Sequence, residues 1–228
     1  MKVKKLQWDS DFFNKAIGEI TIENNCNKPI FVNNFDLIYL KSKSDFYYEF
    51  ENFIENFKEI KVIFEKKLTP NFVSENPNIT TLSNITFDKH TLYQLAFESG
   101  KYSRYKLDNN FDSDDFLKLY KKWVDNSINN TFADNILVYL FESEIVGFVS
   151  YKKQNSYAKI GLIAINPNHQ GKGIGRQLMQ ALENELQQIG IIFLQIPTQF
   201  SNDMACNFYN SIGYKIIEKQ IIKHFWRI

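Results

Sequence analysis

The order of apolar and polar positions along the C-terminal part of the chain predicts helices alternating with strands. Apolar residues at helical spacing predict helices at residues 88–100, 112–128, 174–189 and 201–214. Short apolar or alternating runs predict strands at residues 135–143, 144–154, 157–167 and 191–197, and a terminal strand or hairpin at 215–228. This part therefore has the order expected of a packed α/β unit.

The N-terminal part has a different pattern. Residues 16–22, 35–42 and 59–68 are expected to be strands, and the phenylalanines of 44–57 fall at helical spacing, which predicts a helix there. Pro, Asn, Ser and Thr gather over residues 69–84, a composition typical of a linker. We therefore expect a small α/β domain at residues 1–80 and a second domain at 81–228.

The composition argues against a nucleic-acid-binding, a membrane or a secreted protein. The 228 residues are 44% hydrophobic and 23% charged with a formal net charge of +1, which is an ordinary globular balance that favours neither a nucleic-acid nor a membrane partner. There is no apolar stretch long enough for a signal peptide or a membrane-spanning helix. Cys26 and Cys206 are far apart and form no metal-binding pair. A cytoplasmic location is the expectation.

The stretch "INPNHQGKGIGRQLMQAL", residues 165–182, places three glycines between a strand and an amphipathic helix. Lys172 is followed by Gly173, so the loop is not a Walker A motif, which needs Ser or Thr there. The dinucleotide-binding pattern fails as well, because the spacing is G-x-G-x-G late in the chain. Glycines before a helix N-terminus still suit an anion, since backbone N–H groups can approach it closely. A plain helix-capping turn is the alternative.

The segment "IGLIAINPNHQGKGIGRQLMQAL" resembles the acetyl-CoA-binding core of the GCN5-related N-acetyltransferase (GNAT) superfamily. "SNDMACNFYNSIGY" is similar to a later helix of the same family. The resemblance implies a central mixed, largely antiparallel sheet splayed at the acetyl-CoA site. It further implies that Leu162, Ile163 and Ile165 line pantetheine and that Asn202 lies near CoA. The residues implied to bind its pyrophosphate are Gln170, Gly171, Lys172, Gly173, Ile174 and Gly175.

Four stretches resemble a narrower group, the bacterial dTDP-fucosamine acetyltransferases. They are "LQWDSDFF", "SGKYSRY", "AKIGLIAI" and "PTQFSNDMACNFYNSIG". That family carries a small α/β domain before its transferase domain, and it acetylates the 4-amino group of a dTDP-linked 4-amino-4,6-dideoxyhexose for surface polysaccharides. The resemblance implies the same substrate class here, and it leaves a homodimer open.

Acetyl transfer from a thioester needs a neutral amine, donors for the developing oxyanion and a proton for the departing thiolate. Tyr209 is the expected proton donor, as the family match implies, although its spacing also fits an apolar helix stripe. A backbone N–H near Ile163 is the expected oxyanion donor. "AKIGLIAI" contains no Glu, so the general base stays unassigned, with Glu98 and Glu142 as candidates that also suit a solvated surface.

Arg104 and Tyr105 lie in a basic, aromatic segment that suits a sugar-nucleotide diphosphate, and Gln199 is placed to bond either substrate. A solvated loop is the alternative for this segment. The three histidines have no metal-ligand spacing, so no metal is expected. Three functions remain open: an N-acetyltransferase for a nucleotide-linked amino sugar, one for a protein N-terminus or another small amine, and a non-catalytic CoA-binding module. The sequence leaves the sugar isomer and the nucleotide undetermined.

Overall fold

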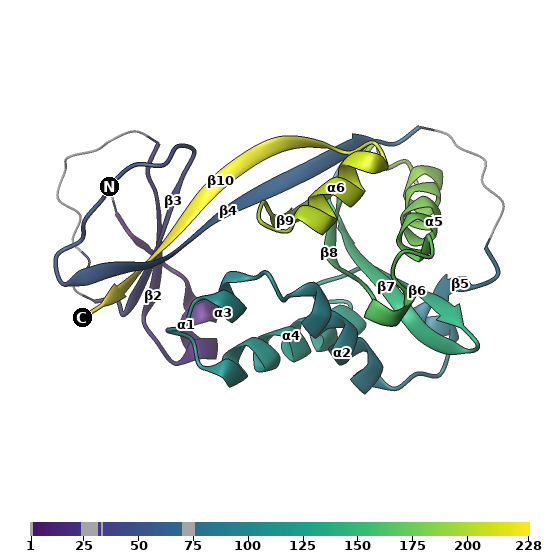
Figure 1. Ribbon diagram of the computed structural model, residues 1–228, viewed down its shortest axis with the longest axis horizontal. Helices are drawn as coiled ribbons and strands as arrows, with labels where there is room; N and C mark the ends of the chain where they lie inside the picture. Colours follow the sequence, from purple (N-terminus) through teal and green to yellow (C-terminus); the bar gives the residue numbers. More distant parts are fainter. Residues whose placement is uncertain (1, 24–31, 33, 70–75) are drawn as a thin grey trace.

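The computed structural model describes residues 2–23, 32, 34–69 and 76–228. The described strands form one ten-stranded sheet in the order β1-β2-β3-β10-β4-β9-β8-β7-β6-β5 (Figure 1). Their bounds are β1 Lys4–Lys5, β2 Ile17–Thr21, β3 Leu37–Ser42, β4 Phe53–Lys67, β5 Ile79–Thr81, β6 Asn135–Phe141, β7 Glu144–Lys153, β8 Tyr157–Ile165, β9 Phe193–Gln199 and β10 Lys215–Arg227. Within this sheet β2/β3 and β8/β9 are parallel, while the other neighbours are antiparallel. The predicted mixed, largely antiparallel sheet is confirmed.

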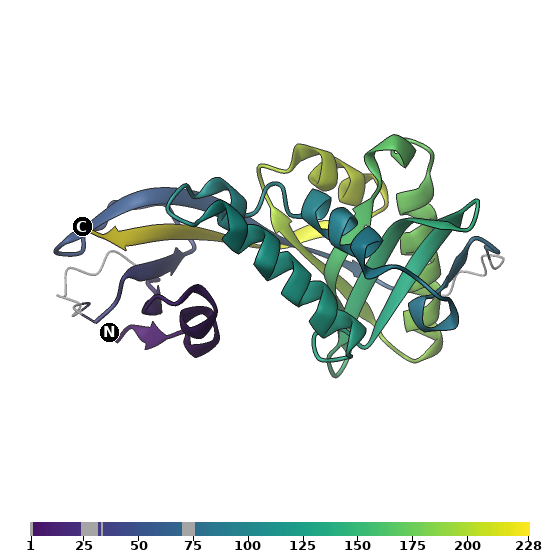
Figure 2. The same cartoon turned by 90° about the horizontal axis from the view of Figure 1, so that it is seen from below.

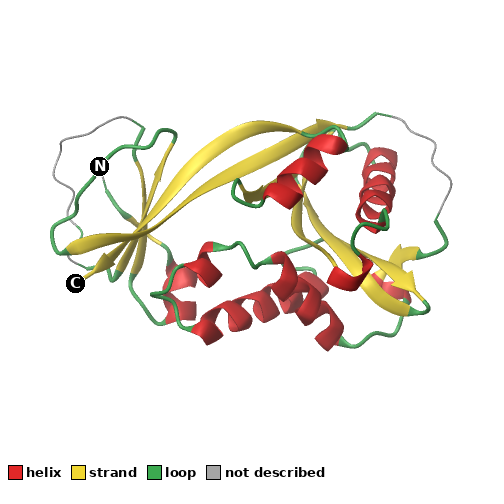
Figure 3. Ribbon diagram, in the orientation of Figure 1, coloured by secondary structure: helices red, strands yellow, loops and turns green. Residues whose placement is uncertain are grey.

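Helices cover both faces of the C-terminal half of this sheet (Figure 3). Their bounds are α1 Gln7–Phe13, α2 Lys89–Ser99, α3 Arg104–Leu107, α4 Ser113–Ile128, α5 Ile174–Gln188 and α6 Asp203–Ser211. Strand β6 shows the two faces: Ile136 and Val138 pack in the cluster under α2 and α4, whereas Leu137 and Tyr139 pack with α5. The period of two along a strand produces this division. The helices and strands expected between residues 88 and 214 are confirmed, with ends that move by a few residues.

Strands β4 and β10 form a long antiparallel ribbon that arches over α3 and α4 (Figures 1 and 2). β4 also pairs with β9, so a strand from the N-terminal part lies between two strands of the C-terminal part. The far end of β10 pairs with β3. The described sheet therefore runs through both predicted domains, and the boundary near residue 80 stays a prediction.

The helix expected at residues 44–57 is wrong. Residues 45–50 have no regular structure, Asn52 turns the chain at φ 63°, and β4 begins at Phe53. Phe50 and Phe53 instead pack with Phe225 of β10 in the N-terminal cluster. Pairing with the thirteen-residue β10 outweighs the helical spacing, because strand preference depends on tertiary partners.

The sequence did not predict several short elements. Among them are β1, α1, which contains most of "LQWDSDFF", the one-turn helix α3, and β5 inside the expected linker. The terminal segment forms the single strand β10 rather than a hairpin. Cys26 and part of the expected linker, residues 70–75, lie outside the described residues. In the described part of the chain, no helix combines the length and apolarity that crossing a bilayer requires.

Candidate active site

Strands β8 and β9 separate after a short paired stretch. They pair at Tyr157/Phe193, Ala158/Leu194 and Lys159/Gln195, and the described register ends there although both strands continue. The opening between them belongs to a cavity of about 670 Å³. That volume lies within the usual range for small-molecule sites, roughly 300–1,000 Å³. The splay expected from the family resemblance is present.

The glycine loop forms one wall of this cavity. Gly171 and Gly173 adopt φ values of 75° and 80°, the left-handed region that glycine occupies without strain. Gly173 is the N-cap of α5, and among the described residues no side chain caps that helix. The first N–H groups of α5 are therefore free of intrahelical partners, and the positive end of the helix dipole faces the same space. These donors fit the pyrophosphate of acetyl-CoA.

The outer part of β8 forms a second wall. Leu162, Ile163 and Ile165 line the cavity. The N–H of Leu162 donates to Ser150 Oγ at 2.9 Å, beside a register shift in the β7–β8 pairing. A hydrogen bond to a side chain thus replaces a regular backbone hydrogen bond between β7 and β8, where β8 separates from β9. The irregular pairing lets β8 bend away from β9.

Helix α6 places Tyr209 on the cavity. Asn202 is the N-cap of α6 and accepts from the N–H of Ala205 at 3.2 Å, which fixes the start of the helix. Tyr209 is 5% exposed, and its ring contacts Phe64 and Phe208, each with a centroid separation of 5.5 Å. Burial raises the pKa of the Tyr209 phenol well above its usual value. The phenol is therefore protonated at neutral pH.

Arg104 and Tyr105 of α3 line the opposite side of the cavity. The Arg104 guanidinium donates to the Tyr105 hydroxyl at 2.9 Å, lies 4.6 Å from the Tyr39 ring centroid and 3.7 Å from the Glu59 carboxylate. Burial opposes its charge, but Tyr105, Tyr39 and Glu59 outweigh burial and raise the pKa of Arg104. Arg104 is thus a fixed cation with further N–H donors available for an anion.

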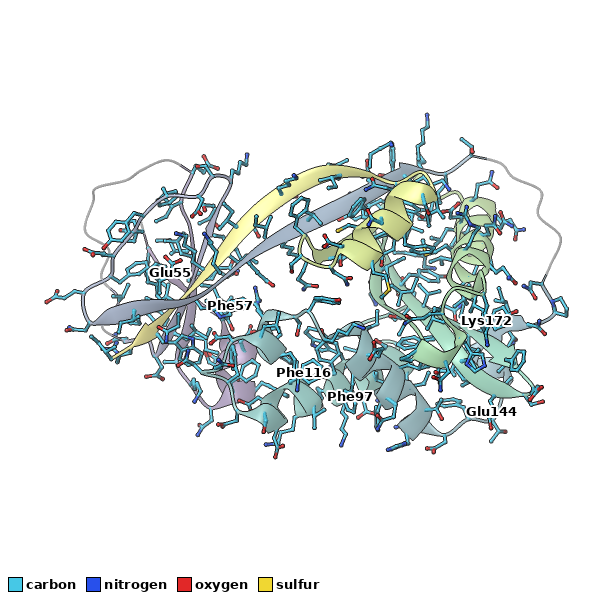
Figure 4. The ribbon with its side chains drawn as sticks, in the orientation of Figure 1. Glu55, Phe57, Phe97, Phe116, Glu144 and Lys172 are labelled. Atoms are coloured by element: carbon cyan, nitrogen blue, oxygen red, sulfur yellow. The ribbon has the colours of Figure 1, made fainter. Side chains whose placement is uncertain are left out.

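The structure brings nearly all of the predicted site residues together. The ones that line the cavity are Arg104, Tyr105, Leu162, Ile163, Ile165, Gln170, Gly171, Gly173, Ile174, Gly175, Gln199, Asn202 and Tyr209. Lys172 does not line the cavity. Its ammonium lies 6.0 Å from the Phe141 ring centroid, by the β6–β7 turn (Figure 4). Of the two candidate bases, Glu98 lines the cavity but pairs with Lys101, and Glu142 is not among the lining residues.

The sequence did not reveal the two charged lining residues of β4. Glu59 and Lys61 reach the cavity from β4, and the signal for them is their alternation with Ile60 and Val62 along the strand. The pKa of Lys61 is lowered to about 8 by burial and then by neighbouring cations, Lys159 first among them. Burial and these cations disfavour the charge on Lys61, and an anion bound beside it would favour that charge. Among the described residues there is no cluster of three or more metal-ligating side chains.

The sequence profile of the acetyltransferase (GNAT) family matches residues 90–214, and the chain belongs to this family. Members use acetyl-CoA as the acyl donor. A solved structure of a protein assigned to the same family, from Novosphingobium aromaticivorans, covers 85% of this chain and 75% of its own at 12% identity, with a TM-score of 0.56. That likeness agrees with the fold described above.

Three curated relatives are similar over different lengths. The spore coat polysaccharide biosynthesis protein SpsD of Bacillus subtilis is 24% identical over 139 residues, 61% of this chain, which spans about half of that relative (48%). The uncharacterized N-acetyltransferase MJ1207 of Methanocaldococcus jannaschii is 26% identical, covering 79% of this chain and 90% of its own length. The ribosomal protein bS18-alanine N-acetyltransferase of Haemophilus ducreyi is 31% identical over 91 residues, 40% of this chain and 63% of the relative.

Proposed function

We propose that this protein transfers acetyl from acetyl-CoA to the 4-amino group of a nucleotide-linked 4-amino-4,6-dideoxyhexose, with dTDP as the carrier. The observation that supports an acetyltransferase best is one cavity that joins the left-handed glycine loop, the splayed β8 and the protonated Tyr209. In this proposal Gln170 to Gly175 hold the pyrophosphate, Leu162 to Ile165 line the pantetheine arm, and Tyr209 protonates the departing sulfur.

The wall opposite the glycine loop has the charges and rings that a nucleotide-linked sugar would need as the acceptor. Arg104 and Lys61 are both partly buried cations on that wall. A diphosphate carries two negative charges, and an arginine can bind it through two parallel hydrogen bonds. Tyr105 and Trp123 supply ring surface for a sugar or a base in the same space. The likeness to SpsD, whose name refers to polysaccharide synthesis, favours the same acceptor class.

The second candidate acceptor is a protein N-terminus. The partial likeness to bS18-alanine N-acetyltransferase favours it, but that match covers only 40% of this chain. A peptide acceptor would not need two partly buried cations beside the acetyl site.

Free-thiol release from acetyl-CoA, measured against dTDP- and UDP-linked 4-amino sugars and an alanine-starting peptide, separates the candidates. We expect turnover with a dTDP-4-amino-4,6-dideoxyhexose and at least 10-fold lower kcat/KM with the UDP sugar and the peptide. Turnover of the peptide with neglect of the sugars would overturn the acceptor assignment. Binding of acetyl-CoA without turnover on any amine would favour a non-catalytic module.

A further inference from the structure

We propose that Glu59 of β4 is the general base that takes the proton from the acceptor amine. This inference rests on the proposed N-acetyltransferase function. Glu59 would supply the carboxylate that β8, the strand before the glycine loop, lacks, because "AKIGLIAI" contains none.

The strand geometry brings Glu59 to the acetyl site. Figure 4 marks Glu55 and Phe57, which precede Glu59 on β4. Side chains alternate along a strand, so Glu59 and Lys61 share the face that lines the cavity. Gln199, directly opposite Lys61 on β9, lines the same cavity. Tyr209 lines it from α6, so acid and base belong to one space.

One carboxylate oxygen of Glu59 has no hydrogen-bond partner in the described part of the chain. The side chain is 8% exposed, and its Oε1 lies 3.7 Å from the Arg104 guanidinium. Its Oε2 is buried and has no hydrogen-bond partner among the described residues. An unpaired carboxylate oxygen is costly to bury, and a structural ion pair alone would not require it. Because Glu59 itself lines the cavity, a turn of its carboxylate would bring this oxygen to an ammonium bound there.

Charged and titratable groups surround Glu59 on several elements. Lys61 on β4, Arg104 and Tyr105 on α3 and Tyr120 on α4 interact with Glu59 directly. Lys159 on β8, Tyr39 on β3, and His224 on β10 with its partner Asp108 interact with Lys61 or Arg104 and form the next layer. Burial raises the pKa of Glu59, while Arg104 and Lys61 oppose that shift. Burial also lowers the pKa of His224 to about 4, so this imidazole is neutral at neutral pH. A base with a raised pKa is better matched to an amine than an ordinary carboxylate is.

The proton balance of the step closes without another reagent. The acceptor enters as an ammonium, and Glu59 takes one proton, which leaves the lone pair on nitrogen. That pair forms the C–N bond at the thioester carbonyl carbon, and the C–S bond breaks with its electrons on sulfur. Tyr209 protonates the sulfur and is restored by the second proton that nitrogen loses. Glu59 then releases its proton to solvent, so one proton is released per turnover.

The test compares Glu59→Gln with Glu65→Gln in the full-length protein. Glu65 lies on the same strand, outside the cavity lining, and its carboxylate accepts from Gln195 at 2.8 Å. For each variant, kcat/KM for the amino sugar is measured from pH 5 to 10, and acetyl-CoA affinity by calorimetry. We expect Glu59→Gln to lower kcat/KM by about 10²–10⁴ at neutral pH with unchanged acetyl-CoA affinity.

The shape of the pH profile distinguishes a base from a structural carboxylate. In the wild type, kcat/KM should fall at low pH as Glu59 becomes protonated, because only its ionised form accepts a proton. In Glu59→Gln this acid limb should move up to the pKa of the amine itself, and the deficit should shrink at high pH. Glu65→Gln should keep the wild-type profile.

A profile of Glu59→Gln that coincides with the wild type, in an enzyme that turns over, would overturn the base assignment and leave the proposed function standing. Wild-type protein that acetylates no amine would instead refute the proposed function, and the base with it. If Glu59→Gln does not fold, Glu59→Asp decides the question. A base role predicts a retained acid limb at a changed pH with lower kcat, whereas a purely structural role predicts an unmoved limb.

Discussion

At the scale of single residues, Tyr209 has the two properties that a proton donor to sulfur needs. Its phenol lies on the cavity, and burial keeps it protonated. We expect Tyr209→Phe to lower kcat by about 10²–10³, because general acid catalysis contributes on the order of 10²–10⁴. Acetyl-CoA affinity should change less than threefold, since the hydroxyl acts mainly in the transition state. Steady-state kinetics and calorimetry on the same preparations measure the two effects.

Tyr214→Phe is the matched control for that substitution. Tyr214 is a buried neighbour whose ring centroid lies 6.3 Å from that of Tyr209, and its hydroxyl donates to Glu183 at 2.8 Å, outside the cavity lining. Losing this bond should lower the free energy of unfolding by about 1 kcal/mol and leave kcat near the wild-type value. Equal kcat losses in the two variants would show that packing, and not the Tyr209 hydroxyl, accounts for the effect.

Local sequence was enough to find Tyr209 and the glycines, because each belongs to a short motif whose spacing is set by one helix or one loop. Glu59 and Lys61 belong to no such motif. They reach the cavity because β4 pairs with β9 and β10, which lie more than a hundred residues further along the chain. Local patterns do not reveal pairing over that distance, so these two residues required the structure.

At the scale of elements, the N-terminus of α5 is the part that the proposed pyrophosphate site depends on. We expect Gly173→Val to weaken acetyl-CoA binding at least 10-fold. A β-branched residue is strained at φ 80°, and its side chain would stand where the anion approaches the backbone. Calorimetric titration with acetyl-CoA measures the loss.

Gly190→Val controls for backbone strain alone. Gly190 follows the other end of α5 at φ 82°, in open space and outside the cavity lining. Its substitution should lower the thermal midpoint without changing acetyl-CoA affinity. Normal affinity in Gly173→Val, or an equal loss in both variants, would contradict the loop assignment.

The elements also show where periodicity succeeds and where it fails. Helix α5 was predicted well because its apolar stripe, its glycine-rich start and Gly190 at its end all agree. The segment 44–57 was misread because phenylalanines at helical spacing are also compatible with a turn followed by a strand. In the structure Phe53 is buried at the start of β4, while the next residue, Ile54, is half exposed. What decided the outcome was the long partner β10.

At the scale of the whole molecule, β4 ties the N-terminal part to the catalytic part. It supplies the strand between β9 and β10, the hydrophobic contacts of Val62 and Phe64 with the α5–α6 cluster, and two residues of the cavity wall. The composition of residues 69–84 suggested a boundary that separates two domains. Because strands pair across that boundary, an experiment must decide whether the two parts fold independently.

Expression of residues 81–228 alone tests that independence. Without β3 and β4, β10 would lose both neighbouring strands and β9 would expose an unpaired edge, and the apolar surface under Phe64 would face water. We expect the fragment to aggregate or to unfold without cooperativity, and to bind acetyl-CoA at least 100-fold more weakly than the full chain. Solubility, thermal unfolding and calorimetric titration give the readouts. A fragment that folds cooperatively and binds acetyl-CoA like the full protein would establish 81–228 as a separate domain, with β4 needed only for the acceptor side of the cavity.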